Sequence, residues 1–388
     1  MKRLFSSCWG FILVLGMVLS SCGREHDFEL KDTYDDYTGL SFTLNDSVMH
    51  GCTLKLYTDN TEYARIEVEG AKVDLNGLLS ILAGKISIPG GTKAAPKTSV
   101  VSTCILPGSP MIVIDEFILK SSNGYRFSGN GKSDNCTFYY SGRVLENGIE
   151  FRLSDVKMKN ELPLPGNNLK VYSAQGNFIN VNWQYMEGKK PETAIGDLLN
   201  DGIVLPMLSQ LLVQKIQGMM VYKGGDVTLA LADHETKRGL AQYVVCNGSD
   251  MRIYLNVPEI VVMLMTRADA GGGDIDKIIK DLIPILSQYL AKMVNEGILV
   301  HYSLSTTGMS VTLDSATVIR IMNLLSLALS DEVVINMLQG LLEEKLPQEM
   351  RPLLPMIMGV IKALPANLEV TEKLDVSFNF SLTPVPVS

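Results

Sequence analysis

Cys22 is the residue whose surroundings point most clearly to a reaction. It ends the sequence Leu19-Ser20-Ser21-Cys22, in which two small side chains directly precede a thiol. A thiol is a good nucleophile and can take up a diacylglyceryl group, and small residues ahead of it let a peptidase close around the backbone. The pattern therefore predicts lipid attachment at Cys22 and cleavage of the chain directly before it.

The residues before Cys22 have the order of a secretory leader. Lys2 and Arg3 form a basic start, and residues 11–19 (FILVLGMVL) form an apolar core. This core is shorter than the roughly 20 residues that a membrane-spanning helix needs. With Cys22 at its end, the segment resembles a lipobox and predicts a lipoprotein signal peptide over residues 1–21. An ordinary secretory leader with a chance cysteine is the alternative.

A lipid on Cys22 would make a membrane the first expected partner, because two acyl chains anchor a protein stably. We expect an outer-membrane lipoprotein of the cell envelope, facing the periplasm or the cell surface. Residues 22–38 are polar and charged and predict a flexible tether. Glu25, Asp27 and Glu29 loosely resemble the acidic export tag of surface lipoproteins in Bacteroidetes, although acidic linkers are common without that role.

The sequence predicts lipidation at Cys22 but no catalytic residue, no metal site and no cofactor. The four histidines, His26, His50, His234 and His301, lack the close spacing of zinc ligands. Ser154 and Lys157 fit a Ser-x-x-Lys pattern but are expected at a strand end, whereas that chemistry needs them one helical turn apart. The sequence thus favours a non-enzymatic protein, and a hydrolase with residues remote in sequence is the weakest of three hypotheses.

Charge and cysteine content narrow the partners further. The net charge is −8, and loss of Lys2 and Arg3 makes it −10, which argues against a nucleic-acid partner. Four cysteines would remain besides Cys22, namely Cys52, Cys104, Cys136 and Cys246. Their wide spacing favours buried small side chains over disulfides, while three pairings stay possible.

The predicted secondary structure changes near residue 165, from mostly strands to strands mixed with helices. Residues 39–165 predict a β-rich domain, with β-forming runs at 54–57, 64–68, 137–140 and 149–153 and a hairpin turn at Asn147-Gly148. Residues 166–388 predict an α+β domain, with strands at 226–231, 243–246, 251–255 and 299–304. Its apolar stretches predict helices over 194–221, 275–294, 316–329, 332–344 and 349–364.

A strand that runs into a helix recurs three times, with a short polar residue at each junction. These residues are Asn76, Asn256 and Asp314, which can accept hydrogen bonds from the first helical turn. Each unit follows another strand across a polar turn. The pattern predicts hairpin-plus-helix units packed on a sheet.

Methionine is frequent in the apolar stretches and suits either a core or a pocket for irregular apolar ligands. The residues in question are Met207, Met219, Met220, Met263, Met265, Met322, Met337, Met356 and Met358. The leading hypothesis is a protein that binds an apolar or amphipathic small molecule. The main alternative is a surface protein that binds a glycan or a protein partner in an outer-membrane complex.

Three segments carry a family resemblance: Leu19-Ser20-Ser21-Cys22, residues 148–158 (GIEFRLSDVKM) and residues 161–166 (ELPLPG). With them the chain resembles Bacteroides-type lipoproteins of an uncharacterised, domain-of-unknown-function family. The resemblance implies a calycin-like barrel and no known activity. The expected fold is α+β, with an antiparallel sheet or partial barrel first and hairpin-plus-helix units with several apolar helices second.

Overall fold

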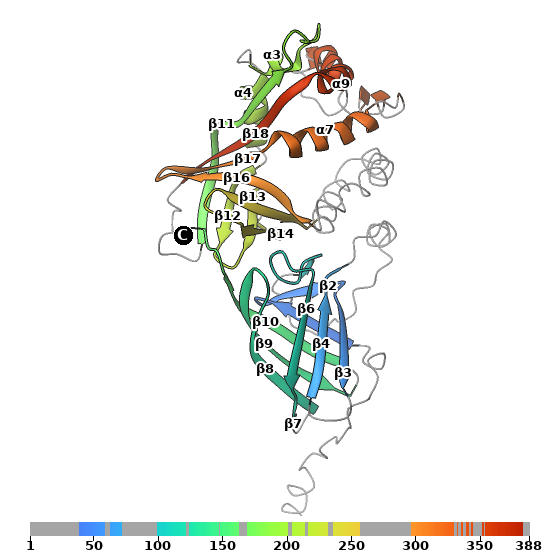
Figure 1. The fold of residues 1–388 in the computed structure, drawn as a ribbon, viewed down its shortest axis with the longest axis vertical. Coiled ribbons are helices and arrows are strands. Elements are labelled where there is room, and N and C mark those ends of the chain that lie inside the picture. Colours follow the sequence, from blue (N-terminus) through green and yellow to red (C-terminus); the bar gives the residue numbers. More distant parts are fainter. Residues whose placement is uncertain are drawn as a thin grey trace, which may run out of the picture.

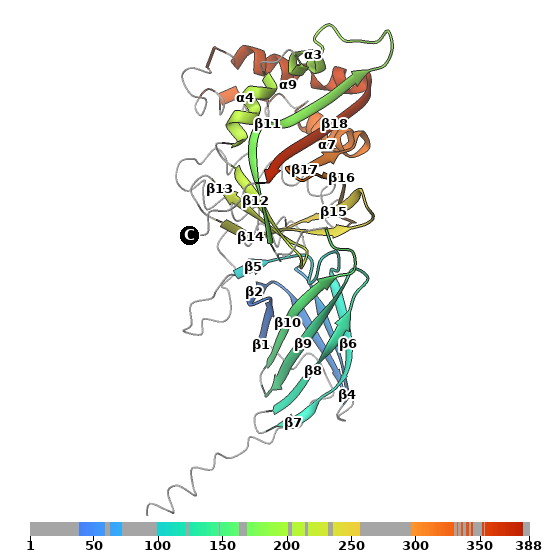
Figure 2. The ribbon, with the colours of Figure 1, turned by 90° about the vertical axis from the view of Figure 1, so that its left-hand side faces the viewer.

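The computed structural model consists of two β-rich parts that lie end to end along the long axis of the molecule (Figures 1 and 2). It describes residues 39–58, 63–71, 99–121, 124–146, 148–162, 169–200, 204–213, 216–231, 236–256, 296–329 and 354–382, with a few further positions between 332 and 352. The last strand of the N-terminal part ends at Met158, and the first strand of the C-terminal part begins at Leu169.

Two sheets form the N-terminal part. The larger has seven strands in the order β5-β2-β1-β10-β9-β8-β7, and the smaller has the order β3-β4-β6. The strands are β1 (Gly39–Leu44), β2 (Ser47–His50), β3 (Thr53–Thr58), β4 (Tyr63–Glu69), β5 (Ser99–Val101), β6 (Met111–Phe117), β7 (Leu119–Ser121), β8 (Gly124–Lys132), β9 (Cys136–Leu145) and β10 (Gly148–Met158). The expected antiparallel sheet is in fact mixed, because β1 pairs in parallel with β10 and β2 with β5.

Aromatic rings fill the space between these two sheets. Alternating residues of each strand point inward, as the period of two requires, and the rings of Phe42 and Phe127 lie 5.8 and 5.7 Å from that of Phe151. Gly142 makes this possible, because a Cβ there would lie 2.2 Å from the Phe127 ring. Apolar residues of the smaller sheet, such as Ile66, close the same core.

The C-terminal part is an eight-stranded antiparallel sheet that curls until its first and last strands, β11 and β18, pair and close it. Its strands are β11 (Leu169–Tyr185), β12 (Ile216–Tyr222), β13 (Asp226–Leu231), β14 (Thr236–Val245), β15 (Asp250–Leu255), β16 (Ile298–Leu304), β17 (Gly308–Leu313) and β18 (Thr371–Leu382). The closed barrel is therefore C-terminal, whereas the sequence analysis placed a partial barrel in the N-terminal part.

Helices are few among the described residues, and the expectation of several apolar helices is not supported. The helices are α3 (Ile195–Asn200), α4 (Val204–Val213), α7 (Ser315–Ala328) and α9 (Leu354–Glu369). The expected helix over 194–221 is wrong in its last part, because residues 216–221 belong to strand β12. The expected helix over 275–294 and most of 332–344 lie outside the described residues. None of the helices described is both long and apolar enough to cross a bilayer.

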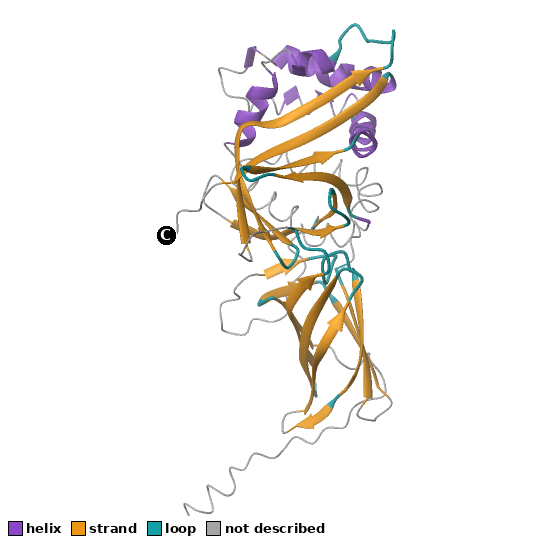
Figure 3. Ribbon diagram, turned by 60° about the vertical axis from the view of Figure 1, so that its left-hand side comes forward, coloured by secondary structure: helices purple, strands orange, loops and turns teal. Residues whose placement is uncertain are grey.

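The helices gather at the end of the barrel that is farther from the N-terminal sheets (Figure 3). There they cover the extensions of β11 and β18, where Trp183 and Leu374 pack against helical side chains. Asn367 of α9 ties this layer together: its Oδ1 accepts hydrogen bonds from the Tyr185 hydroxyl at 2.6 Å and the Ile195 amide at 3.0 Å. Because Asn367 is buried and fully bonded, it stabilises the layer.

One predicted hairpin-plus-helix unit is confirmed. Strands β16 and β17 form a hairpin that leads into α7. The Asp314 carboxylate accepts a hydrogen bond from the Thr317 amide at 2.8 Å and so caps the helix as expected. In the second unit, the Asn256 side-chain amide donates to the Gly239 carbonyl oxygen at 2.6 Å, and the residues expected to form its helix lie outside the described residues. Asn76 lies outside the described residues.

Candidate functional site

Cys22, the one site residue that the sequence predicts, lies outside the described residues, as do the whole predicted signal peptide and tether. Ser154 and Lys157 both lie on strand β10, and the pairing register shifts between them around Asp155, whose φ is +52°. They therefore lack the helical spacing that Ser-x-x-Lys chemistry requires.

The described histidines do not come together. His50 lies on β2 in the N-terminal part, where burial lowers its pKa, and His301 lies on β16 in the barrel. His301 faces Asp250, whose pKa is lowered by hydrogen bonds from Asn247 and His301. Within the described part of the chain, no group of three potential metal ligands is found.

The interior of the barrel holds an apolar cavity of about 160 Å³. Its walls come from six barrel strands, β12, β13, β14, β15, β17 and β18, and from the segment that joins the two parts. The lining residues are Leu162, Met219, Val221, Val227, Tyr243, Met251, Ile253, Met309, Val311, Phe378 and Phe380. All of these side chains except Phe378 belong to the apolar core of the barrel or pack against it, so the cavity is continuous with that core.

Strand periodicity explains why these residues share one cavity. Lining residues occur two apart on the same strand, as in Met309 and Val311, which places both on the concave face. The neighbouring strand supplies their direct cross-strand partners: Val311 is paired with Phe378, and Met309 with Phe380. Adjacent strands thus present matched apolar pairs to the cavity.

Tyr243 contributes its ring to the cavity while its hydroxyl bonds elsewhere. The hydroxyl donates to the Tyr222 carbonyl oxygen at 2.7 Å, and the residue is almost fully buried. The polar atom is thereby satisfied away from the cavity, as buried tyrosines require. The cavity wall consequently offers a ligand apolar contact rather than hydrogen bonds.

Phe178 packs against two aromatic rings of the cavity wall. Its ring lies 5.1 Å from that of Phe380, edge to face, and 5.7 Å from that of Phe378. Phe178 lies where the pairing of β11 with β18 shifts register, between Ala174 and Ile179. Buried aromatic contacts of this kind hold the two wall rings in place.

The predicted pocket residues are only partly those of the cavity. Among the nine methionines considered from sequence, Met219 lines it, but from a strand and not from a helix. Sequence reasoning missed Met251 and Met309, although the alternation of Met251 with Ile253 and of Met309 with Val311 could have indicated one inward face. Met263, Met265 and Met337 lie outside the described residues.

The cysteines have varied surroundings. Cys104 and Cys136 are buried, as expected of small apolar side chains, whereas Cys246 is exposed and Cys52 is half-buried. Burial raises the pKa of the Cys52 thiol to about 12 and that of Cys104 to about 11. At neutral pH these two thiols are therefore protonated and unreactive.

The chain matches no protein-family model, and neither the curated proteins nor the solved structures contain a significant match to it.

Proposed function

We propose that this protein is a lipid-anchored protein of the bacterial envelope that binds an apolar small molecule, or the apolar end of an amphipathic one, inside its C-terminal barrel. The observation that carries the proposal is the apolar cavity in the barrel core. Binding pockets are commonly apolar hollows in the mouths or interiors of barrels.

The size of the cavity limits what it can enclose. An engineered cavity of about 150 Å³ with apolar walls in another protein stays dry and binds benzene or xenon. A hollow of about 160 Å³ is therefore suited to a single small ring or a short hydrocarbon segment. The three methionines in the wall add adaptability, because the thioether chain is flexible and polarizable. We infer that a larger amphipathic ligand would bury only one end.

The cavity gives no support to the hydrolase hypothesis, because its lining contains no carboxylate, imidazole, thiol or amine. A catalytic site needs a nucleophile or a general acid and base within reach of the substrate. The lipid anchor is a separate part of the proposal and depends on Cys22 alone.

The test uses the chain from residue 23 onward, which retains every residue that the structure describes. Native mass spectrometry of the purified protein, followed by organic extraction, should reveal a bound apolar mass that is released on unfolding. If the protein is purified empty, it should take up benzene or a short-chain hydrocarbon. A protein that carries nothing and takes up neither probe would contradict the proposal.

A matched pair of variants localises the binding. Val311→Phe adds a ring at the cavity wall and should abolish uptake. Val113→Phe makes the same change on the exposed face of β6 and should leave uptake unchanged. Equal uptake by Val311→Phe and the unmodified protein would place the ligand elsewhere.

A further inference from the structure

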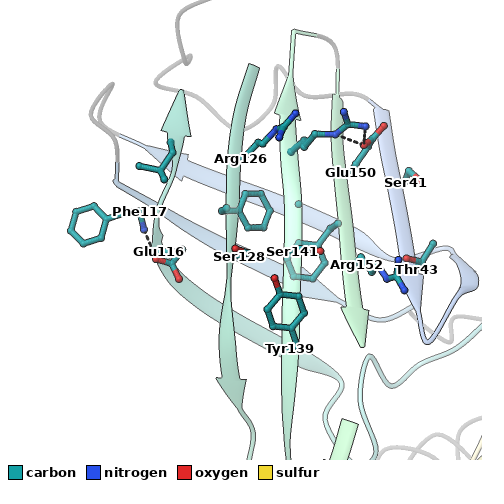
Figure 4. Close-up of a pocket in the computed structure, with 15 residues that line it drawn as sticks. Ser41, Thr43, Glu116, Phe117, Arg126, Ser128, Tyr139, Ser141, Glu150 and Arg152 are labelled. Carbon is teal, nitrogen blue, oxygen red and sulfur yellow. Dashed lines mark hydrogen bonds and ion pairs between the residues drawn. The ribbon is translucent and has the colours of Figure 1, made fainter. Parts of the chain in front are cut away.

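A second hollow lies on the outer face of the seven-stranded sheet, far from the barrel cavity. It is an open groove of about 790 Å³ over β1, β10, β9 and β8, bordered by the end of β6 and by β7. Figure 4 shows that the polar side chains of neighbouring strands follow one another across it. We call it the arginine groove. Its polar lining residues are Ser41, Thr43, Glu116, Arg126, Ser128, Tyr139, Ser141, Arg143, Glu150 and Arg152.

Two arginines face each other in this groove. Arg126 of β8 is the direct cross-strand partner of Arg143 of β9, and Arg143 is in turn paired with Glu150 of β10. Glu150 accepts hydrogen bonds from Arg143, with Nε at 2.8 Å. Like charges directly opposite in a sheet are destabilising. In this row of cross-strand partners, two guanidinium groups lie beside a single carboxylate, that of Glu150, which is bonded to Arg143.

Of the three arginines in the groove, Arg126 is the one without an acidic partner among the described residues. Arg152, the third arginine, is paired with Asp46 at 2.8 Å. Glu116 accepts a hydrogen bond from Tyr140, whose hydroxyl has its pKa raised by burial and by this carboxylate. Among the described residues, Arg126 forms neither an ion pair nor a side-chain hydrogen bond. It is exposed in a protein whose net charge is −8, so the positive site is a local feature.

The rest of the groove suits a chain of hydroxyl-bearing rings. Ser128 and Ser141 are cross-strand partners in the row next to the arginines. Beyond them lies Tyr139, which is 38% exposed and can offer the face of its ring. Arg143 and Tyr139 are four residues apart on β9, or about 13 Å at the usual strand rise. That length fits a short oligosaccharide rather than one sugar ring.

We propose that the arginine groove binds an acidic oligosaccharide. Its carboxylate or sulfate group would lie between Arg126 and Arg143, because guanidinium groups bind such oxyanions in a bidentate manner. The oxyanion would relieve the repulsion between the two arginines. Sugar hydroxyls would bond to Ser128 and Ser141, and a neighbouring ring would stack on Tyr139. This site is independent of the barrel cavity and of any ligand there.

The experiment is calorimetric or NMR titration of the chain from residue 23 with four probes: tetragalacturonate, a sulfated chondroitin tetrasaccharide, neutral maltotetraose and tetraglutamate. At least one of the two acidic sugars should bind, and the stronger of them identifies the anionic group. Maltotetraose should bind more weakly. Tetraglutamate binding as strongly as the better sugar would overturn the saccharide assignment in favour of an acidic peptide, and failure of both acidic sugars would overturn the proposal altogether.

Variants then test the geometry. Arg126→Gln should weaken binding of the acidic sugar roughly tenfold or more, as expected for a charge-assisted hydrogen bond. It should not lower the thermal midpoint of the free protein, because it removes a repulsion. Arg320→Gln, which changes an exposed arginine on α7, is the matched control and should bind normally. Unchanged binding by Arg126→Gln, or equal weakening by Arg320→Gln, would contradict the proposed site.

Discussion

The interiors of the two parts differ, although both are enclosed by β-strands. Between the N-terminal sheets, the ring of Phe151 lies 5.8 Å from that of Phe42 and 5.7 Å from that of Phe127. Inside the C-terminal barrel, a wall of aliphatic, methionine and aromatic side chains borders a cavity of about 160 Å³. Two facing sheets thus enclose a core of packed rings, whereas the closed barrel encloses a core that contains a cavity.

Side-chain shape accounts for the difference. In the N-terminal part, position 142 is a glycine, and the absence of a side chain there leaves room for the Phe127 ring. In the barrel, the two phenylalanines of the wall, Phe378 and Phe380, pack against Phe178 of β11. Protein interiors are otherwise packed as densely as organic crystals. An unfilled apolar volume therefore calls for a functional explanation.

The largest expected effect comes from removing a ring in the solid core. Phe151→Ala should lower the free energy of unfolding by about 3–5 kcal/mol, because the surrounding side chains cannot collapse into the space. Met309→Ala in the barrel should lower the free energy of unfolding by about 2 kcal/mol. This is the low end for truncation of a buried methionine, because Met309 already borders a cavity. Chemical denaturation measures both. Equal losses would remove the distinction between the two interiors.

A smaller effect should differ in sign between the two parts. Val144→Leu adds a methylene group to the packed N-terminal core and should destabilise the protein by about 1–3 kcal/mol. Val311→Leu adds the same group beside the cavity and should be neutral or should stabilise by about 0.5–2 kcal/mol, as cavity-filling changes do. Thermal unfolding of both variants would show this, and destabilisation of both by similar amounts would mean that the barrel is as tightly filled as the sheets.

The smallest effect concerns the thiols. At pH 8 a thiol reagent should modify Cys246 rapidly in the folded chain from residue 23, and Cys52 and Cys104 only after unfolding, because burial raises their pKa values to about 12 and 11. Stability linked to these two thiols is present below their unfolded pKa and is lost as the pH rises toward the raised values. Cys246→Ser should remove the rapid phase, and a rapid phase that survives this change would show that one of the other thiols is accessible.

Sequence alone predicted much of the local structure. Strand β13 has the predicted bounds, and the predicted hairpin near residue 147 is confirmed, since β9 and β10 pair in an antiparallel manner. Gly148 is already the first residue of β10, and Asn147 lies outside the described residues. These features depend on alternation and on turn residues that tolerate positive φ, which are visible within a few residues. The Asp314 cap was predictable for the same reason, because its bonding partner is three residues away.

The barrel and its cavity were not predictable to the same degree. Closure depends on the pairing of β11 with β18, which lie far apart in the chain, and no local pattern reports it. The apolar run that contains Met219 fits a buried strand as well as a helix, so periodicity could not decide between them. The hollow itself depends on which inward side chains fail to meet, and this follows only from the assembled strands.

The most direct test of the apolar site is NMR of the methionine methyl groups, labelled with ¹³C, while benzene is added. Met219, Met251 and Met309 line the cavity, whereas Met49 is buried in the N-terminal core and Met111 and Met186 are exposed. We predict saturable shifts of the first three signals, with Met49, Met111 and Met186 unchanged. Unmoved signals for the three cavity methionines, or equal shifts of all six, would contradict a ligand site in the barrel.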